Sequence, residues 1–87
     1  MNLDKFKNYM LGQSHSVVTI KAYIRYIKQF DHDIDQLDNY KIAEKLYEMG
    51  SSRQQKKNIA KAINVYLEFR NRDFKLKLPK TDDSSDV

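Results

Sequence analysis

The sequence predicts an all-α fold in which four helices form a single compact bundle. Residues that break regular structure are scarce, because the 87-residue chain contains only two Gly and one Pro, and hairpin-rich folds use more of both. Apolar residues recur at spacings of three and four along most of the chain, which is the period of an amphipathic helix. Hydrophobic residues make up 40% of the chain and charged residues 32%, as in a globular domain. A chain of this length has room for one core.

The first two helices are expected over residues 3–11 and 16–30. Gly12 is a suitable stop for the first helix. Ser16 is a natural N-cap for the second, because its hydroxyl oxygen accepts an otherwise unpaired backbone N–H. The β-branched residues of the second segment also suit a strand, but their spacing favours a helix. The apolar faces of the two helices comprise Leu3, Phe6, Met10, Val17, Ile20, Tyr23, Ile24, Ile27 and Phe30.

The third and fourth helices are expected over residues 40–49 and 52–72. Asp38 or Asn39 caps the start of the third helix. Gly50 suits the left-handed position that follows a helix end. The apolar faces of these helices comprise Ile42, Leu46, Met49, Ile59, Ala62, Ile63, Tyr66 and Phe69.

The chain after the fourth predicted helix alternates apolar and basic residues. In the stretch DFKLKLP, aromatic and aliphatic side chains alternate with lysines, and Pro79 prevents a fifth helix. This pattern predicts an extended exit segment or a docked tail. The folded domain is expected to span residues 1–80, and the sequence TDDSSDV at 81–87 is expected to be a disordered acidic tail.

The composition argues against several classes of protein. Without Cys there is no disulfide, no Cys-based zinc site and no thiol nucleophile. No run of 18 apolar residues is present and the N-terminus carries charges throughout, so we expect neither a membrane span nor a signal peptide, and a cytoplasmic location. We recognise no phosphate loop, glycine-rich dinucleotide turn or Ser–His–Asp arrangement. We therefore expect no enzymatic activity, no cofactor and no small-molecule substrate.

An acidic segment at residues 31–38 contains one of the two histidines. A metal site formed by Asp31, His32, Asp33 and Asp35 is one interpretation, and an exposed charged loop is the preferred one. The segment lacks the Gly and the terminal Glu of a calcium-binding loop. We therefore expect no metal site.

The positive charge is unevenly distributed along the chain. The formal net charge is +4, but the last seven residues hold three Asp and no Lys or Arg. Residues 1–80 consequently carry 16 basic and 9 acidic residues, a balance of +7. An excess of this kind points to a polyanionic partner.

Two of the predicted helices carry basic lines that no acidic residue interrupts. Lys21, Arg25 and Lys28 follow one another at i, i+4 and i+7, and residues 16–30 contain no acid. Their line lies about 100° around the helix from the apolar line, given 3.6 residues per turn. A lysine line is in most cases only a solvated helix face. An uncompensated line repels itself, however, which favours a polyanion as partner.

The fourth predicted helix carries the second basic line. Arg53, Lys57 and Lys61 share its polar side with Gln54 and Asn64, and its only acidic residue is near the C-terminal end. Amide side chains pair with adenine edges, whereas Arg and Lys suit guanine or phosphate. The residue types on this face are therefore those of a duplex DNA reader.

Three stretches of the sequence resemble a known family. SHSVVTIKAYIRYIKQF is similar to the opening of the core-binding domain of tyrosine recombinases, the phage-type and archaeal integrases and the Xer group, with Ser16, Thr19, Tyr23 and Phe30 at the matching positions. FKNYML resembles the first helix of that domain, and KKNIAKAINVYLEFRNR resembles its fourth. The resemblance extends over residues 3–78 and is carried mostly by structural residues.

The resemblance implies a four-helix, SAM-like bundle that clamps one side of double-stranded DNA with its second and fourth helices. The family's catalytic domain has no counterpart here, so no residue is expected to be catalytic. The chain would then be a recombinase fragment or a stand-alone DNA-binding protein associated with the nucleoid. The implied DNA contacts are Ser16, Thr19, Lys21, Arg25, Lys28, Ser52, Arg53, Gln54, Lys57 and Lys61.

Two other functions fit the sequence less well. A helical protein-interaction module, or a self-associating one, would use apolar residues off the main faces, namely Leu11, Val18 and Tyr47. Val18 lies in line with the first basic stripe, where it could instead contact a thymine methyl group. A helix-turn-helix regulator needs a turn of three or four residues. The gap at Gly50–Ser51 meets this requirement, with the fourth helix as the reader.

Overall fold

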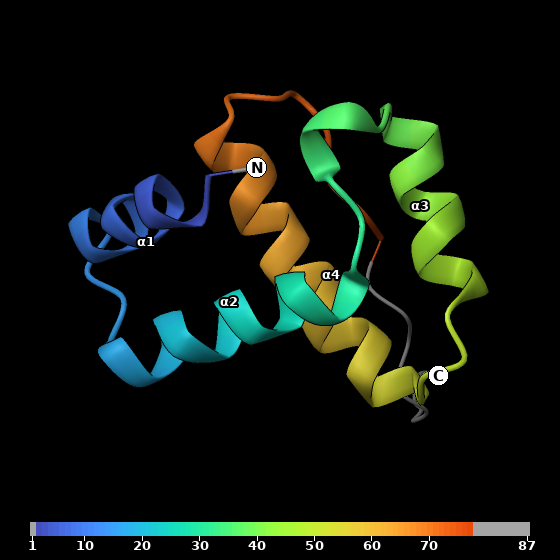
Figure 1. Ribbon diagram of the computed structural model, residues 1–87, viewed down its shortest axis with the longest axis horizontal. Helices are drawn as coiled ribbons and strands as arrows, with labels where there is room; N and C mark the ends of the chain where they lie inside the picture. Colours follow the sequence, from blue (N-terminus) through green and yellow to red (C-terminus); the bar gives the residue numbers. More distant parts are fainter. Residues whose placement is uncertain (1, 78–87) are drawn as a thin grey trace, which may run out of the picture.

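The computed structural model describes residues 2–77 of the chain (Figure 1). These residues contain four α-helices and one 3₁₀ helix. The elements are α1 (Leu3–Gly12), α2 (Val17–Phe30), η1 (Ile34–Gln36), α3 (Asn39–Glu48) and α4 (Arg53–Phe69). Residues 2–77 contain no strand. The prediction of an all-α fold with four helices is therefore confirmed.

Polar side chains cap the start of every α-helix. The Ser16, Asp38 and Ser52 side-chain oxygens each accept the backbone N–H three residues further on, at 3.1, 2.8 and 3.2 Å. Each bond satisfies one of the N–H groups that a helix start leaves unpaired. Asn2 caps α1 in the same way, at 3.1 Å. The caps expected at Ser16 and Asp38 are confirmed.

The prediction that Gly50 adopts a left-handed conformation is wrong. No glycine has a positive φ among the described residues, and α3 ends at an extended Met49. The left-handed positions are occupied by Ser14, Asp31 and Asn71. Such backbone angles are tolerated by Asn and Asp, whose short polar side chains bond locally.

The core lies where α2 crosses α4, and Figure 1 shows α2 running across the front of α4. Ile20 and Ile27 of α2 pack with α4 residues that are fully buried. At the C-terminal end of α4, Phe6 of α1 lies edge-on to Tyr66, with ring centroids 5.0 Å apart. Phe69 joins this cluster at 5.6 Å from Phe6. The apolar faces expected from the helical spacing thus meet in one interior.

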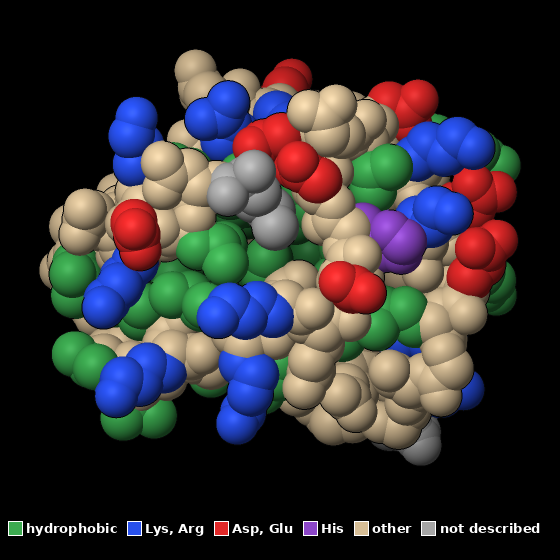
Figure 2. Space-filling view, in the orientation of Figure 1, with side chains coloured by type: hydrophobic (Ala, Val, Ile, Leu, Met, Phe, Trp, Pro, Cys, Tyr) green, Lys and Arg blue, Asp and Glu red, His purple; other side chains and the backbone are tan. Residues whose placement is uncertain are grey.

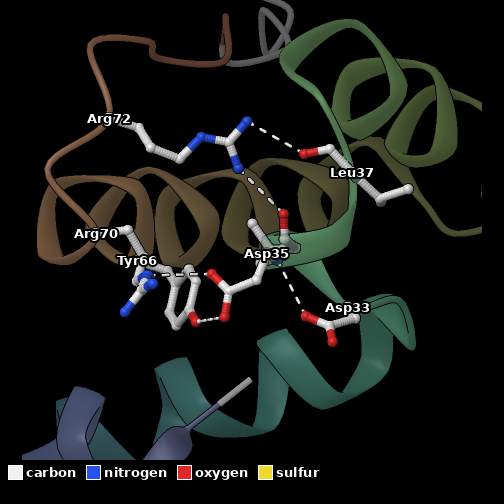
Figure 3. A network of polar contacts seen from close by, with 7 residues as sticks. Asp33, Asp35, Leu37, Tyr66, Arg70 and Arg72 are labelled. Carbon is white, nitrogen blue, oxygen red and sulfur yellow. Dashed lines mark hydrogen bonds and ion pairs between the residues drawn. The ribbon is translucent and has the colours of Figure 1, made fainter.

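Most residues of the acidic segment 31–38 are exposed, as predicted, but the segment is anchored to the core through Ile34. Ile34 is fully buried, and it is the first residue of the 3₁₀ helix η1. Asp35 accepts a hydrogen bond from the Tyr66 hydroxyl at 2.8 Å and pairs with Arg70 at 3.2 Å (Figure 3). Burial of Tyr66, followed by its hydrogen bond to Asp35 and the charge of that carboxylate, raises the pKa of the phenol above its usual value.

Arg72 fastens the same segment from the other side (Figure 3). Its guanidinium donates to the carbonyl oxygens of Ile34 at 3.1 Å and Leu37 at 3.2 Å, and to the side chain of Asn39. These partners lie 33 to 38 residues away in the sequence. The fork of guanidinium N–H groups therefore joins the end of α4 to the start of α3.

The segment after α4 is a docked tail, the second of the two forms that we predicted. The helix ends at Phe69, three residues earlier than expected, and Asn71 has a φ of 60°. Leu76 is 7% exposed. Its backbone N–H donates to Asn64 Oδ1 at 2.7 Å, and its carbonyl accepts from Asn64 Nδ2 at 3.2 Å. The predicted boundary at residue 80 and the tail at 81–87 lie outside the described residues.

Candidate nucleic-acid interface

The basic line on α2 lies on the outside of the bundle. Lys21, Arg25 and Lys28 are all exposed, and Figure 2 shows Lys and Arg side chains gathered over α2 at the lower edge of the molecule. The Arg25 guanidinium carbon lies 5.7 Å from the centre of the Tyr26 ring, a cation–π distance that leaves the N–H groups able to donate. Within residues 2–77, none of the three is in an ion pair with a carboxylate.

The start of α2 adds hydroxyl and amide donors to this line. Ser16 Oγ accepts the Thr19 N–H at 3.1 Å and donates its own proton to Thr19 Oγ1 at 2.9 Å. The Thr19 hydroxyl therefore keeps its proton for an external acceptor, whereas the Ser16 hydroxyl is engaged at both ends. Helix starts also present unpaired N–H groups and positive dipole ends, which suit phosphate.

The basic line on α4 occupies its N-terminal half. Ser52 is the N-cap, Arg53 and Gln54 are exposed, Lys57 is half-buried and Lys61 is exposed. The Gln54 amide donates to Asn58 Oδ1 at 3.4 Å. Lys57 and Lys61 form no ion pair with another described residue. Their ammonium groups are therefore available to a phosphate.

One hydrogen bond between helices brings part of the two lines together. Gln55 Nε2 donates to Gln29 Oε1 at 2.9 Å, which holds the end of α2 against the start of α4. Lys28 neighbours Gln29 in sequence and Gln54 neighbours Gln55, so the end of the α2 line and the start of the α4 line lie on helix ends that approach at one corner of the bundle. The start of α2 at Ser16 lies about 20 Å from that corner, from the rise of 1.5 Å per residue. The candidate site is therefore an extended strip.

One residue of the polar face of α4, Asn64, and one of the predicted DNA contacts, Lys28, are less suited to DNA than the sequence indicated. Asn64 does not belong to the interface, because both ends of its amide are bonded to the backbone of Leu76. Lys28 lines a shallow depression with Asp31 and Asp33, whose carboxylates reduce the positive potential there. The phosphate-binding potential of the strip consequently rests on Lys21 and Arg25 of α2 and on the lysines of α4.

Three ion pairs between described residues lie outside this strip. They join Lys41 to Glu44, Arg70 to Asp35 and Lys75 to Glu68. Glu68, the only acid of α4, is thus at the far end of the helix and faces Lys75 at 3.4 Å. Within residues 2–77, Lys21, Arg25, Lys28, Lys57 and Lys61 take part in no ion pair, which favours an anionic partner.

The histidines and acidic residues form no metal-binding group in the described part of the chain. The His32 ring packs edge-on against Phe30 at 5.1 Å, and the His15 ring against Tyr23 at 5.9 Å. Asp33 Oδ1 accepts the Asp35 N–H at 3.0 Å. Three of the side chains considered for a metal site thus have other contacts: His32 in packing, and Asp33 and Asp35 in hydrogen bonds. No helix within residues 2–77 has the length and apolar character to cross a membrane.

Comparisons with known proteins identify no relative of this chain. No protein-family model matches the chain, and neither the curated proteins nor the solved structures contain a match.

Proposed function

We propose that the protein binds duplex DNA with the exposed strip formed by α2 and the N-terminal half of α4, without catalysing a reaction on it. The proposal rests mainly on the basic, exposed face of α2. Three exposed basic side chains lie along a 14-residue helix that has no acidic residue. A second helix with uncompensated lysines is joined to it by the bond from Gln55 to Gln29. The resemblance to recombinase core-binding domains supports the same pair of helices.

Most of the binding free energy would come from phosphates. Lys21 and Arg25 would contact one stretch of backbone, and Lys57 and Lys61 another, while the Thr19 hydroxyl and the first N–H groups of α2 would receive a phosphate at the helix start. Arg53 and Gln54 are the side chains whose chemistry suits base edges. In cells, this activity would place the protein at the nucleoid, as part of a recombinase or as a separate DNA-binding protein.

The strength of such binding falls steeply with salt. Neutralising about five phosphates releases their counterions, so the logarithm of the association constant should fall against the logarithm of salt concentration with a slope of about −4.5. Fluorescence anisotropy with a labelled generic duplex measures this slope. An affinity that does not change with salt, or no binding at low salt, would refute the proposal.

A charge-reversal pair tests the position of the contact. Lys57→Glu with Lys61→Glu should lower duplex affinity at least about tenfold, because two phosphate contacts become repulsions. The matched control is Lys5→Glu with Lys7→Glu, which makes the same charge change on exposed residues of α1. Both variants should keep the far-ultraviolet circular dichroism of the original protein. Equal losses in the two variants would show that only the net charge matters.

A further inference from the structure

An apolar groove lies on a part of the molecule that the proposed DNA contact does not use. It is formed between α3 and residues 74–77, and its volume is about 880 Å³. Leu46 and Leu76, which are almost fully buried, lie at its base beside Ala43 and Phe74. Figure 1 shows α3 at the edge of the bundle opposite α1. A groove of this size and character is a place where another molecule can bury apolar surface.

Two tyrosines on the same helix stand at this groove with their rings in solvent. Tyr40 is 72% exposed and Tyr47 is 84% exposed. They are seven residues apart, so both project from one side of α3. Tyrosine is a residue type that anchors protein interfaces, because a large apolar ring is combined with a polar end.

Lys56 holds the Tyr47 ring in position. Its ammonium group donates to the Tyr47 carbonyl at 3.0 Å and lies 5.6 Å from the centre of the ring. This cation–π contact favours one position of an otherwise exposed ring, and a favoured position lowers the entropy that binding has to overcome.

The two walls of the groove carry opposite charges. Glu44 and Glu48 lie on the α3 wall, and Lys75 and Lys77 on the opposite wall. Glu44 already faces Lys41 at 3.6 Å, and Lys75 faces Glu68 at 3.4 Å. Within residues 2–77, Glu48 and Lys77 take part in no ion pair. Besides the Lys56 ammonium group, which donates to the Tyr47 carbonyl, the remaining charges are thus Glu48 on one wall and Lys77 on the other.

A second copy of the same chain fits this arrangement. In a two-fold symmetric dimer the same patch meets itself, so the α3 wall of each copy faces the opposite wall of its partner. The acidic wall then meets the basic wall twice, and each Tyr47 meets an apolar groove. A partner with one sign of charge would be repelled by one of the two walls.

We propose that this groove is the interface of a symmetric homodimer, in which Tyr47 of each copy enters the groove of the other and Glu48 pairs with Lys77 across the interface. This dimer does not depend on DNA, so its presence or absence leaves the proposed function untouched. A dimer would present two α2–α4 strips to one duplex.

Sedimentation equilibrium of the full chain, from micromolar to near-millimolar concentration, tests the dimer. The original protein should associate reversibly to a dimer, and Tyr47→Arg should raise the dissociation constant at least about tenfold, as expected for loss of an anchor. The control is Val18→Arg, because Val18 is 78% exposed on α2 and lies outside the groove. A monomer at every concentration, or equal dimerisation of Tyr47→Arg and the original protein, would overturn the proposal.

An exchange of charges tests the same interface without removing the aromatic ring. Glu48→Lys alone and Lys77→Glu alone should each weaken the dimer, because each creates two like-charged contacts. An equimolar mixture of the two single variants should dimerise again, since every contact across that heterodimer joins opposite charges. An effect within one chain cannot be restored by mixing. Failure of the mixture to associate more strongly than either variant alone would overturn the pairing.

Discussion

The basic side chains at the two ends of α4 differ in whether they have partners within the protein. At its C-terminal end, Arg70 binds Asp35 and Arg72 binds the backbone of residues 34–37, so both guanidinium groups have partners within the protein. In its N-terminal half, Lys57 is half-buried and Lys61 is exposed, and neither forms an ion pair with another described residue. Basic side chains therefore hold the fold together in one region and remain available to a polyanion in the other. This difference determines which substitutions should affect stability and which should affect binding.

The largest loss of stability is expected from Ile34→Ala. Ile34 is fully buried, and removing its side chain leaves a cavity among α4, η1 and α2. The free energy of unfolding should fall by about 2–5 kcal/mol. Urea unfolding followed by circular dichroism measures the change. A change typical of a surface residue would mean that residues 31–38 are not anchored to the core through Ile34.

Arg72→Ala should have the next largest effect. The substitution removes three hydrogen-bond partners from the segment between η1 and α3, two of them backbone carbonyls. We expect a loss of about 2 kcal/mol in unfolding free energy, since bonds to a charged donor are stronger than neutral ones. Arg25→Ala serves as the control and should change stability by less than about 0.5 kcal/mol. Equal losses from the two substitutions would remove the distinction between the two regions.

Tyr66→Phe tests the bond at the centre of the same network. Loss of the hydrogen bond to Asp35 should lower the unfolding free energy by about 1 kcal/mol at neutral pH. Because the pKa of Tyr66 is raised by folding, the neutral phenol stabilises the protein below about pH 10, and this contribution is lost as pH rises above that value. Tyr66→Phe should lack this part of the alkaline loss, which urea midpoints at neutral and alkaline pH can measure. An identical alkaline loss in both proteins would contradict the role given to the phenol.

The smallest effect on stability, and a clear one on binding, is expected from Arg25→Ala. One phosphate contact is lost, so the slope of log affinity against log salt should become shallower by about 0.9. The unfolding free energy should stay within about 0.5 kcal/mol of the original value. Anisotropy titrations at several salt concentrations provide the slope. An unchanged slope would exclude this residue from the contact.

The helices and their caps could be predicted from sequence because both are local. The spacing of Ile20 and Ile27 specifies a helix face, and Ser16 caps the chain three residues away. Each basic line could be placed for the same reason, since it needs only the period of one helix. The structure adds the Gln55–Gln29 bond, which depends on how α2 crosses α4 and has no local pattern.

The parts that could not be predicted depend on contacts between distant residues. Ile34 is a single apolar residue among acids, and the Tyr66 and Arg72 side chains that fix its segment lie 31 to 38 residues further along the chain. Asn64 shares a helix side with the basic residues, yet its amide is taken by Leu76, 12 residues later. Neither the anchoring of Ile34 nor the bonding of Asn64 to Leu76 is indicated by a local sequence pattern. An amide that suits adenine also suits a backbone peptide group.

The joint use of α2 and α4 can be tested by mapping backbone amide shifts during titration with a short generic duplex. Shifts concentrated at residues 15–28 and again at residues 52–64 are expected if both basic lines contact DNA. Shifts at residues 52–64 alone would indicate a helix-turn-helix mode with α4 as the only reader. Shifts confined to α3 and residues 74–77, or none at low salt, would contradict DNA binding by the α2–α4 strip.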